Sequence, residues 1–368
     1  MKPNPLLELR RFGQQVWLDY IRRDLIAEGR LAAMVHDDGL AGITSNPSIF
    51  EDAITRHHCY DGRLAELRAQ GADALQAYQD LTTEDVRLAA DVLLPQWRAS
   101  GGSAGLVSLE VAPDLADEVE ATVREARALR AAVGRDNLMV KVPGTRAGLA
   151  AIERLIGEGL NINVTLLFSV SRYRAVVDAF LGGLESRLRR GQPVAGIQSV
   201  ASFFISRIDT LVDARIDALA TRDVALRSLR GTAAVVSARL AYAHYLEWTD
   251  GARWRRLAAA GASPQRLLWA STSTKDPAYS DVRYVEELIA PDTITTLPPA
   301  TLDAYRDHGD PAARLALGLA EAPAGRARLA AAGIDLEEVA EQLEREGVEK
   351  FAAARDSLLA TLAERLGG

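Results

Sequence analysis

Eight short apolar runs of strand character recur along this chain, and each is followed by a longer segment with helical periodicity. The runs are residues 14–21, 42–45, 104–111, 137–142, 160–168, 196–204, 266–272 and 292–297. Strands that alternate with helices pair in parallel through right-handed crossover connections. Eight such units favour a closed barrel, which needs about 250 residues. We therefore predict an α/β fold, a (β/α)8 TIM barrel with additional helices.

The chain of 368 residues is longer than a bare barrel requires, and its surplus falls in three segments. Residues 46–103 hold enough chain for two or three helices, and residues 205–265 are rich in Ala and Arg at helical spacing. Because no low-complexity linker interrupts the pattern, we predict one domain. It consists of a catalytic barrel at 1–310 and a helical C-terminal extension at 311–368 that packs on the barrel.

The parity of side chains inside these runs separates an apolar face from a polar one. Alternate residues of a strand point to opposite faces. In GLVSLEV, Ser108 and Glu110 share the face opposite to Val107, and in NINVTL the residues Asn163 and Thr165 likewise share one face. If the apolar faces pack beneath helices, the polar faces converge on the barrel axis. They lie late in their strands, at the end where barrel enzymes build their sites.

A lysine interrupts the apolar run NLMVKVPG at position 141. Only four of the 43 basic residues are lysine, and the other 39 are arginine, which effectively cannot lose its proton. A lone lysine often extends to solvent, but a desolvated one gives the free amine that attacks ketones. The inward-facing set suits a Schiff-base enzyme acting on a hydroxylated carbonyl compound, and its members are Asp19, Asn46, Glu110, Lys141, Asn163, Thr165 and Ser202.

Charge and composition exclude several other classes of protein. A net charge of −7 and an isoelectric point near 5.4 argue against nucleic acid or an anionic membrane as partner. The single cysteine, Cys59, and the absence of a signal-like N-terminus favour a reducing, cytoplasmic location. The run His57-His58-Cys59 has no second cluster at zinc spacing, so we expect no metal and no cofactor.

Six stretches of the chain resemble transaldolases, specifically the longer bacterial type within the class I Schiff-base aldolase superfamily. They are GITSNPSIF, VSLEV, MVKVPGT, GLNINVTLLFS, SVASFFISRID and LLWASTSTKDPAYSD, in the family's order across roughly residues 12–300. The resemblance implies transfer of a dihydroxyacetone unit from a ketose phosphate to an aldose phosphate. The family's usual reaction converts sedoheptulose 7-phosphate and glyceraldehyde 3-phosphate into erythrose 4-phosphate and fructose 6-phosphate, in the non-oxidative pentose phosphate pathway.

Four catalytic roles follow from the resemblance, residue by residue. It implies that Lys141 forms the Schiff base with the ketose phosphate. Asp19 takes the proton of the C4 hydroxyl during cleavage and returns it to the acceptor aldehyde. Glu110 and Thr165 bind and activate the catalytic water.

The resemblance also implies a set of substrate-binding residues. Asn46 and Asn163 hydrogen-bond the dihydroxyacetone hydroxyls with help from Ser202. Phe204 is expected in the same pocket and, with the Glu110–Thr165 pair, fits a transferase. Arg207 points at phosphate, which a planar guanidinium binds with two parallel hydrogen bonds.

The stretch after the seventh run departs from the family pattern. Many transaldolases place a second phosphate-binding Arg there, whereas this chain has Ser273 at that position. We predict that Lys275, with Ser271, replaces the missing Arg, although an ammonium lacks bidentate geometry.

Other interpretations stay open at the level of sequence. A fructose 6-phosphate aldolase-type lyase would release free dihydroxyacetone instead of transferring it. A catalytically silent sugar-phosphate-binding barrel would need no intact catalytic set. Neither the oligomeric state, monomer or homodimer, nor the role of residues 310–368, as a cover for the barrel mouth or a dimer contact, follows from the residues.

Overall fold

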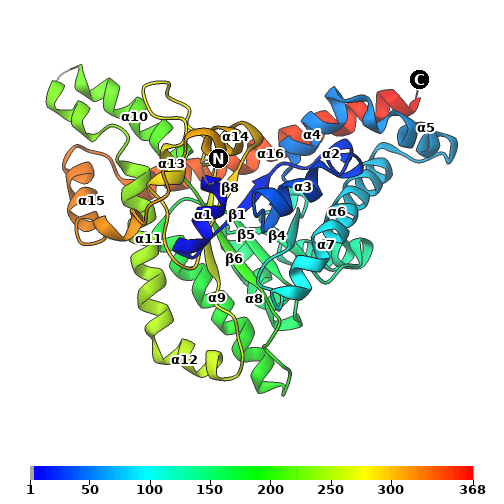
Figure 1. Ribbon diagram of the computed structural model, residues 1–368, viewed down its shortest axis with the longest axis horizontal. Helices are drawn as coiled ribbons and strands as arrows, with labels where there is room; N and C mark the ends of the chain where they lie inside the picture. The colour runs from blue at the N-terminus through cyan, green and yellow to red at the C-terminus, as the bar shows by residue number, and fades with distance from the viewer. Residues whose placement is uncertain (1–3, 222, 368) are drawn as a thin grey trace.

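Eight parallel strands close into a barrel in their sequence order, from β1 to β8 and back to β1 (Figure 1). The computed structural model describes residues 4–221 and 223–367. The strands are β1 (Gln14–Asp19), β2 (Gly42–Thr44), β3 (Leu106–Glu110), β4 (Leu138–Pro143), β5 (Ile162–Leu167), β6 (Ser199–Phe204), β7 (Arg266–Ala270) and β8 (Thr293–Leu297). The predicted (β/α)8 TIM barrel is therefore confirmed. The predicted runs extend up to three residues past the ends of the strands, except that the run 137–142 stops one residue short of the end of β4.

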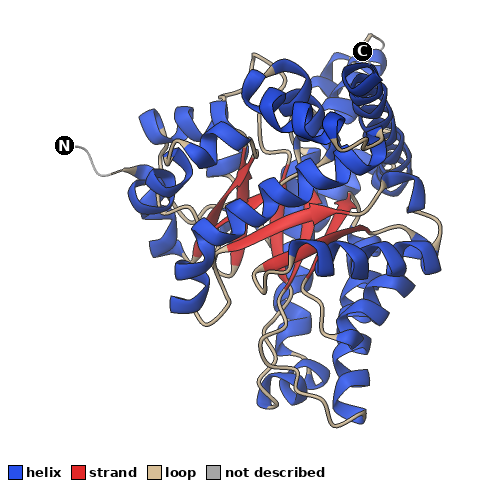
Figure 2. Cartoon of the chain, turned by 90° about the vertical axis from the view of Figure 1, so that its right-hand side faces the viewer, coloured by secondary structure: helices blue, strands red, loops and turns tan. Residues whose placement is uncertain are grey.

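Helices surround the strands on the outside of the barrel (Figure 2). The three helices between β2 and β3 agree with the two or three predicted for 46–103, and the 205–265 segment is helical as expected. The α-helices are α1 (Pro5–Glu8), α2 (Arg23–Ala27), α3 (Arg30–Asp37), α4 (Pro47–Arg56), α5 (Asp61–Ala69), α6 (Ala74–Ala99), α7 (Val119–Val133), α8 (Arg146–Glu158), α9 (Val170–Arg189), α10 (Ser206–Ala220), α11 (Ala233–Asp250), α12 (Ala252–Ala259), α13 (Arg283–Glu286), α14 (Pro299–His308), α15 (Ala322–Ala331) and α16 (Leu336–Gly367). Short 3-10 turns are η1 (Leu9–Phe12), η2 (His58–Tyr60), η3 (Pro113–Leu115), η4 (Val224–Leu229) and η5 (Leu315–Gly318).

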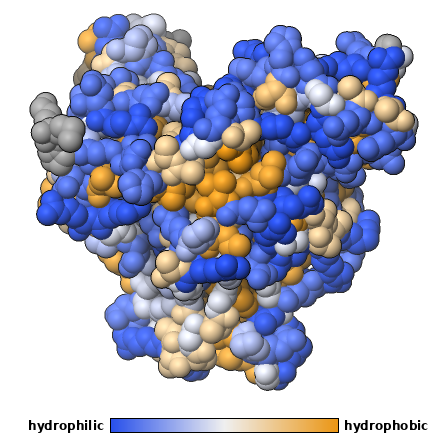
Figure 3. All heavy atoms as spheres, turned by 45° about the vertical axis from the view of Figure 1, so that its right-hand side comes forward, coloured by the Kyte–Doolittle hydropathy of each residue, from blue (hydrophilic) through white to orange (hydrophobic). Residues whose placement is uncertain are grey.

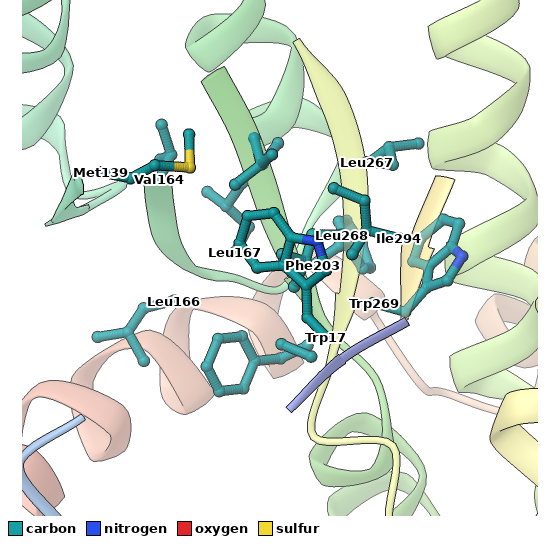
Figure 4. Close-up of a cluster of buried hydrophobic side chains, with 14 of the residues drawn as sticks. Trp17, Met139, Val164, Leu166, Leu167, Phe203, Leu267, Leu268, Trp269 and Ile294 are labelled. Carbon is teal, nitrogen blue, oxygen red and sulfur yellow. The ribbon is translucent and has the colours of Figure 1, made fainter. Parts of the chain in front are cut away.

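The lower part of the barrel interior is filled by apolar side chains. Trp17 is completely buried two residues before Asp19 on β1. Its indole lies against Gly42, where a Cβ atom would come within 2.5 Å of the ring. Figure 4 shows Trp17 with Leu268 and Ile294 among the buried apolar side chains of this core. This packed lower layer closes the barrel below, so the polar residues can form a site only at the upper end.

The pairing register of neighbouring strands places the predicted polar residues at the same height along the barrel axis. Glu110 on β3 pairs with Lys141 on β4, and Lys141 pairs with Asn163 on β5. On the adjoining strands β1 and β2, Asp19 pairs with Thr44. Because paired residues in adjacent strands point to the same face, these side chains share the barrel interior. The convergence predicted from side-chain parity is thus realised by the strand register.

The C-terminal helix α16 lies across the upper end of the barrel beside α4, as Figure 1 shows in red and blue. It also contacts β5, α6 and α10. Gly347 permits this close approach, since a Cβ atom there would come within 2.8 Å of Leu166 on β5 and 3.6 Å of Arg207 on α10. This placement covers the barrel mouth, which is one of the two roles left open for the tail. The division of the chain at residue 310 stays a prediction.

The molecular surface is mainly hydrophilic, with an apolar patch near the centre of the face in Figure 3. None of the helices in the described part of the chain is long and apolar enough to cross a bilayer.

Candidate active site

A cavity of about 160 Å³ opens at the carboxyl ends of the strands. Nine of the eleven residues predicted for the site line it, whereas Glu110 and Asn163 lie behind the lining and contact residues within it. The lining consists of Asp19, Thr44, Asn46, Lys141, Thr165, Ser202, Phe204, Arg207, Leu268, Ala270, Ser271, Ser273, Lys275, Thr296, Pro298 and Phe351.

The amine of Lys141 is enclosed within the barrel. Its Nζ donates a hydrogen bond to the carbonyl oxygen of Ser45 at 2.9 Å and lies 3.2 Å from Glu110 Oε2. The side chains of Lys141 and Glu110 are only 5% and 4% exposed. The alternative in which this lysine extends to solvent is therefore wrong.

Burial dominates the electrostatics of the two carboxyl groups. It raises the pKa of Asp19, while the positive charges of Lys141, Arg207 and Lys275 act in the opposite direction. Burial likewise raises the pKa of Glu110 against the lowering effect of Lys141. A carboxyl group whose pKa is raised toward the working pH exchanges protons more effectively. Asp19 and Glu110 are therefore candidates for general acid–base residues.

Thr165 directs a free hydroxyl into this environment. Its Oγ1 is buried and has no hydrogen-bond partner among the described residues. Thr165 comes from β5, one strand beyond Lys141, and lines the same cavity. A buried hydroxyl with unused hydrogen-bonding capacity is suited to bind a substrate hydroxyl or a water molecule.

A chain of hydrogen bonds fixes the amide of Asn163. Ser202 Oγ donates to Asn163 Oδ1 at 2.7 Å, and Asn163 Nδ2 donates to Ser108 Oγ at 3.0 Å. All three side chains are buried. Side-chain parity put Ser108 on the polar face, but it was not predicted as a site residue. Parity alone does not indicate its bond to Asn163, because that bond depends on the register of β3, β4 and β5.

Asn46 serves two structural purposes at the start of α4. Its Oδ1 accepts a hydrogen bond from Ile49 N at 3.1 Å and so caps the helix, with Pro47 in the first helical turn. The residue also lines the cavity. With Oδ1 engaged in the cap, the amide Nδ2 can donate to a ligand.

Two phenylalanine rings flank the guanidinium of Arg207. Its Cζ atom is 5.2 Å from the centroid of the Phe204 ring and 5.8 Å from that of Phe351. Such cation–π contacts hold a guanidinium in place while its N–H groups stay available. Phe351 belongs to α16 and was missed, because its position depends on how the tail docks. Nothing in the local sequence marks it.

Three cations gather at one side of the cavity. Lys275 Nζ donates to Ser273 Oγ at 2.6 Å, and Ser271 Oγ lies 3.0 Å from Ser206 Oγ. Burial and then the charges of Lys350 and Arg207 lower the pKa of Lys275. Burial and the charge of Arg207 lower the pKa of Lys350, a second α16 residue that was not predicted.

No carboxylate forms an ion pair with any of these three cations within the described residues. Mutual repulsion among like charges costs free energy that an anion would relieve. This side of the cavity is therefore suited to bind phosphate.

The described residues contain no group of three or more His, Cys, Asp or Glu side chains that could hold a metal. His57 is instead in contact with Arg22, whose Nη1 lies 2.9 Å from the imidazole Nε2. Cys59 is a free thiol.

The fold and the enclosed lysine define the class of protein as a (β/α)8 barrel with an amine, two carboxyl groups and a cationic pocket at its mouth. The family model described as Transaldolase/Fructose-6-phosphate aldolase matches residues 16–362. The chain belongs to this family, which confirms the resemblance inferred from its motifs.

Relatives with curated names cover almost the whole chain. A protein of Frankia alni named Transaldolase is 47% identical over 365 residues, which span 99% of this chain and 98% of that protein. A Transaldolase of Thermobifida fusca is 48% identical over 366 residues, with 99% and 98% covered. The protein named Transaldolase 2 in Nostoc sp. is 45% identical over 371 residues, with 98% and 97% covered.

Proposed function

We propose that this protein is a transaldolase that transfers a dihydroxyacetone unit between sugar phosphates through a Schiff base on Lys141. The donor and acceptor are sedoheptulose 7-phosphate and glyceraldehyde 3-phosphate, and the products are erythrose 4-phosphate and fructose 6-phosphate. The observation that carries the proposal is the enclosed amine of Lys141, 3.2 Å from Glu110 and in one cavity with Asp19. The names of the full-length relatives support the same activity.

The first step forms the covalent bond between enzyme and donor. The Nζ atom of Lys141 attacks the C2 carbonyl of the ketose phosphate and gives a carbinolamine, which loses its oxygen as water. Glu110 is near enough to the nitrogen to transfer a proton, and the Thr165 hydroxyl holds the departing water. The product is a protonated imine on Lys141.

The second step breaks the bond between C3 and C4 of the donor. Asp19 removes the proton of the C4 hydroxyl, the new C4 carbonyl leaves as an aldose phosphate, and the electron pair moves toward the iminium nitrogen. The remaining dihydroxyacetone unit is an enamine on Lys141. Asn46 and Asn163, the latter oriented by Ser202 and Ser108, hydrogen-bond its hydroxyls.

The third step reverses this chemistry with the acceptor. The enamine carbon attacks the acceptor aldehyde, and Asp19 returns its proton to the new hydroxyl. Water, activated by Glu110 and held by Thr165, then adds to the imine and releases the product ketose phosphate with a free Lys141 amine. Atoms and charges balance without a metal or cofactor.

Phosphate recognition falls to the cationic side of the cavity. Arg207 and Lys275 supply charge, Ser271 supplies a hydroxyl, and Lys350 adds a third positive charge from α16. Lys275 binds as a point charge, since it cannot form the two parallel bonds of an arginine. We propose that it takes the place of the arginine for which this chain has Ser273.

A second candidate is the fructose 6-phosphate aldolase activity that the family's description also names. Such an enzyme hydrolyses the same intermediate and releases free dihydroxyacetone. Phe204 packs between Phe168 and Arg207, and by the family resemblance a phenylalanine here fits the transferase better. Turnover that requires an aldehyde acceptor supports transfer, whereas dihydroxyacetone release without an acceptor supports the aldolase.

Borohydride reduction in the presence of fructose 6-phosphate tests the proposal directly. Peptide mass mapping is expected to find a dihydroxyacetone-derived adduct on Lys141. An adduct on Lys275 instead would overturn the site assignment but keep the chemistry. Bound sugar phosphate with no adduct would favour the silent barrel.

The setting of the reaction is proposed along with it. The substrates are ketose and aldose phosphates, with no nucleic acid or membrane partner, and the location is cytoplasmic. The net charge of −7 and the lone half-buried thiol of Cys59 support this setting.

A further inference from the structure

The loop after β7, residues 271–282, carries three polar residues of the cavity but no helix or strand of its own. Those residues are Ser271, Ser273 and Lys275. Hydrogen bonds within the loop form local turns, such as those from Tyr279 N to Asp276 O at 3.1 Å and from Thr274 Oγ1 to Ser280 O at 2.8 Å. A loop of this length keeps one conformation only if contacts outside the loop hold it. Some of these contacts come from β8 and α14, and others come from α10 and from the segment between α10 and α11.

Two buried carboxylates of α10 each bridge the loop region and the start of α11. Asp213 accepts from Tyr279 Oη at 2.7 Å through one oxygen and from Gly231 N at 2.8 Å through the other. Asp209 accepts from Tyr284 Oη and from Ala234 N, both at 2.8 Å. We call Asp209, Asp213, Tyr279 and Tyr284 the carboxylate–tyrosine latch.

The spacing on α10 extends the latch by one more turn. Asp209, Asp213 and Asp217 follow at intervals of four residues, so they lie along one side of the helix. Asp217 pairs with Arg230, and Arg230 also reaches Asp276 in the loop at 2.5 Å. Contacts from three successive turns of α10 therefore hold the loop region in place next to Lys275.

The latch lies directly behind the cationic side of the cavity. A second cavity of about 280 Å³ is lined by the carboxylates of α10 and by Tyr279 and Tyr284, and Lys275 lines both this cavity and the one containing Lys141. Arg207 occupies the second position of the same α10 helix. One helix thus presents one phosphate-binding cation itself and holds the loop that presents the other.

We propose that Asp213 and Tyr279 are positioning residues that set the distance between Lys275 and Arg207 and thereby the preference for phosphorylated sugars. The inference rests on the proposed function, because it concerns the phosphate end of that substrate pocket. The latch does not contact the amine of Lys141. Loosening it therefore weakens phosphate binding and leaves imine formation with an unphosphorylated ketone unchanged.

The variant Tyr279→Phe tests this with the least disturbance. It removes one hydroxyl and keeps the ring on which the Arg283 guanidinium lies, 4.4 Å from the centroid. We expect the dissociation constant for inorganic phosphate, measured by calorimetry, and the KM for fructose 6-phosphate each to rise about 3- to 10-fold. The rate of borohydride trapping of dihydroxyacetone on Lys141 should stay within about 2-fold of wild type, because the latch does not touch the amine.

The matched control is Tyr242→Phe. This variant also loses a single hydroxyl hydrogen bond, which Tyr242 Oη donates to Pro291 O at 3.2 Å. That bond lies near the start of β8, at the opposite end of the barrel. Asp213→Asn is the second test variant, since it keeps the shape of the side chain and removes its charge. Thermal unfolding of all variants separates a loss of phosphate affinity from a loss of fold.

The outcomes separate the latch from the proposed function. The proposed role of the latch would be wrong if Tyr279→Phe and Asp213→Asn bound phosphate as tightly as Tyr242→Phe does. It would also be wrong if phosphate affinity and the rate of dihydroxyacetone trapping fell by the same factor. Calorimetry requires no turnover, so the phosphate affinities that it measures do not depend on catalysis. A wild-type protein that binds phosphate but forms no adduct on Lys141 would overturn the proposed function alone.

Discussion

At the scale of single residues, the site depends on the choice of lysine at position 141 in a chain whose cations are almost all arginine. Arginine dominates the ion pairs on the outside of the barrel, such as Arg135 with Asp91 and Arg127 with Glu158. Inside the barrel the amine meets a carbonyl oxygen and a carboxylate instead. Only lysine can give up a proton there and form a carbon–nitrogen double bond with a ketone.

The proposed mechanism needs Asp19 for bond cleavage but not for imine formation. In Asp19→Asn the base for the C4 hydroxyl is absent, and we expect kcat for transfer to fall about 10²- to 10⁴-fold. The imine should still form, because Glu110 stays 3.2 Å from Lys141. Borohydride reduction with fructose 6-phosphate is then expected to trap an adduct that retains all six carbons on Lys141. Wild-type kcat, or loss of the adduct in a folded protein, would contradict this role.

At the scale of elements, α16 makes the C-terminal tail part of the pocket. Phe351 lines the cavity and lies over Arg207, and Lys350 adds its charge to Arg207 and Lys275. These contacts join segments that lie far apart on the chain. In the proposed mechanism, a covered mouth would shield the imine from bulk water until an acceptor arrives.

Replacement of Lys350 measures what α16 contributes to phosphate binding. We expect Lys350→Ala to raise the KM for fructose 6-phosphate about 5-fold, equivalent to about 1 kcal/mol for a partly exposed ionic contact. The kcat should change little, since the charge acts on bound phosphate before and after cleavage. Steady-state kinetics at low and high salt check this, because salt screens such a contact.

The matched control for Lys350→Ala is Arg345→Ala, which removes one positive charge from an exposed position of the same helix. Its KM should stay at the wild-type value. Equal changes in the two variants would mean that net charge, and not a contact with phosphate, accounts for the effect.

At the scale of the whole molecule, stability should depend on pH through the buried Asp209. Burial, opposed by hydrogen bonds from Ala234 and Tyr284, raises the pKa of this carboxyl from 3.8 to about 6. The native state therefore binds a proton more tightly than the unfolded chain. The resulting stabilisation is full below pH 3.8 and is lost as the pH rises through about 6.

Urea unfolding of wild type and Asp209→Asn measures this contribution. Between about pH 5 and pH 8, the free energy of unfolding of wild type relative to the variant should fall by about 1 kcal/mol. Asn cannot titrate, so the variant lacks this component of the pH dependence. A difference that is constant over this range would contradict the raised pKa of Asp209.

Most of the barrel could be predicted because the sequence patterns that indicate its strands and helices are local. Side-chain parity in VSLEV and NINVT depends only on the period of a strand, and the alternation with helices implies parallel pairing. Thus Glu110, Lys141 and Thr165 were predicted together at the carboxyl ends of their strands. The exact ends of the strands were less accurate, because hydrogen bonds to neighbouring strands determine where pairing stops.

Residues on distant segments were missed for a different reason. Ser108 had the right parity, but its partnership with Asn163 depends on the register between β3, β4 and β5. Phe351 and Lys350 lie on α16, and the sequence of this helix predicts only a helical extension. The latch joins an α10 carboxylate to a loop tyrosine 66 positions later.

The sequence by itself determined the alternation of strands and helices, the polar lining of the barrel and the family. Each of these depends on short-range periodicity or on short motifs. The tertiary structure alone decided that α16 covers the mouth and that α10 holds the loop carrying Lys275. These contacts depend on the shapes of surfaces formed only after folding, such as the space that Gly347 leaves for Leu166. Packing between remote segments has no period in the sequence, and so no local pattern reports it.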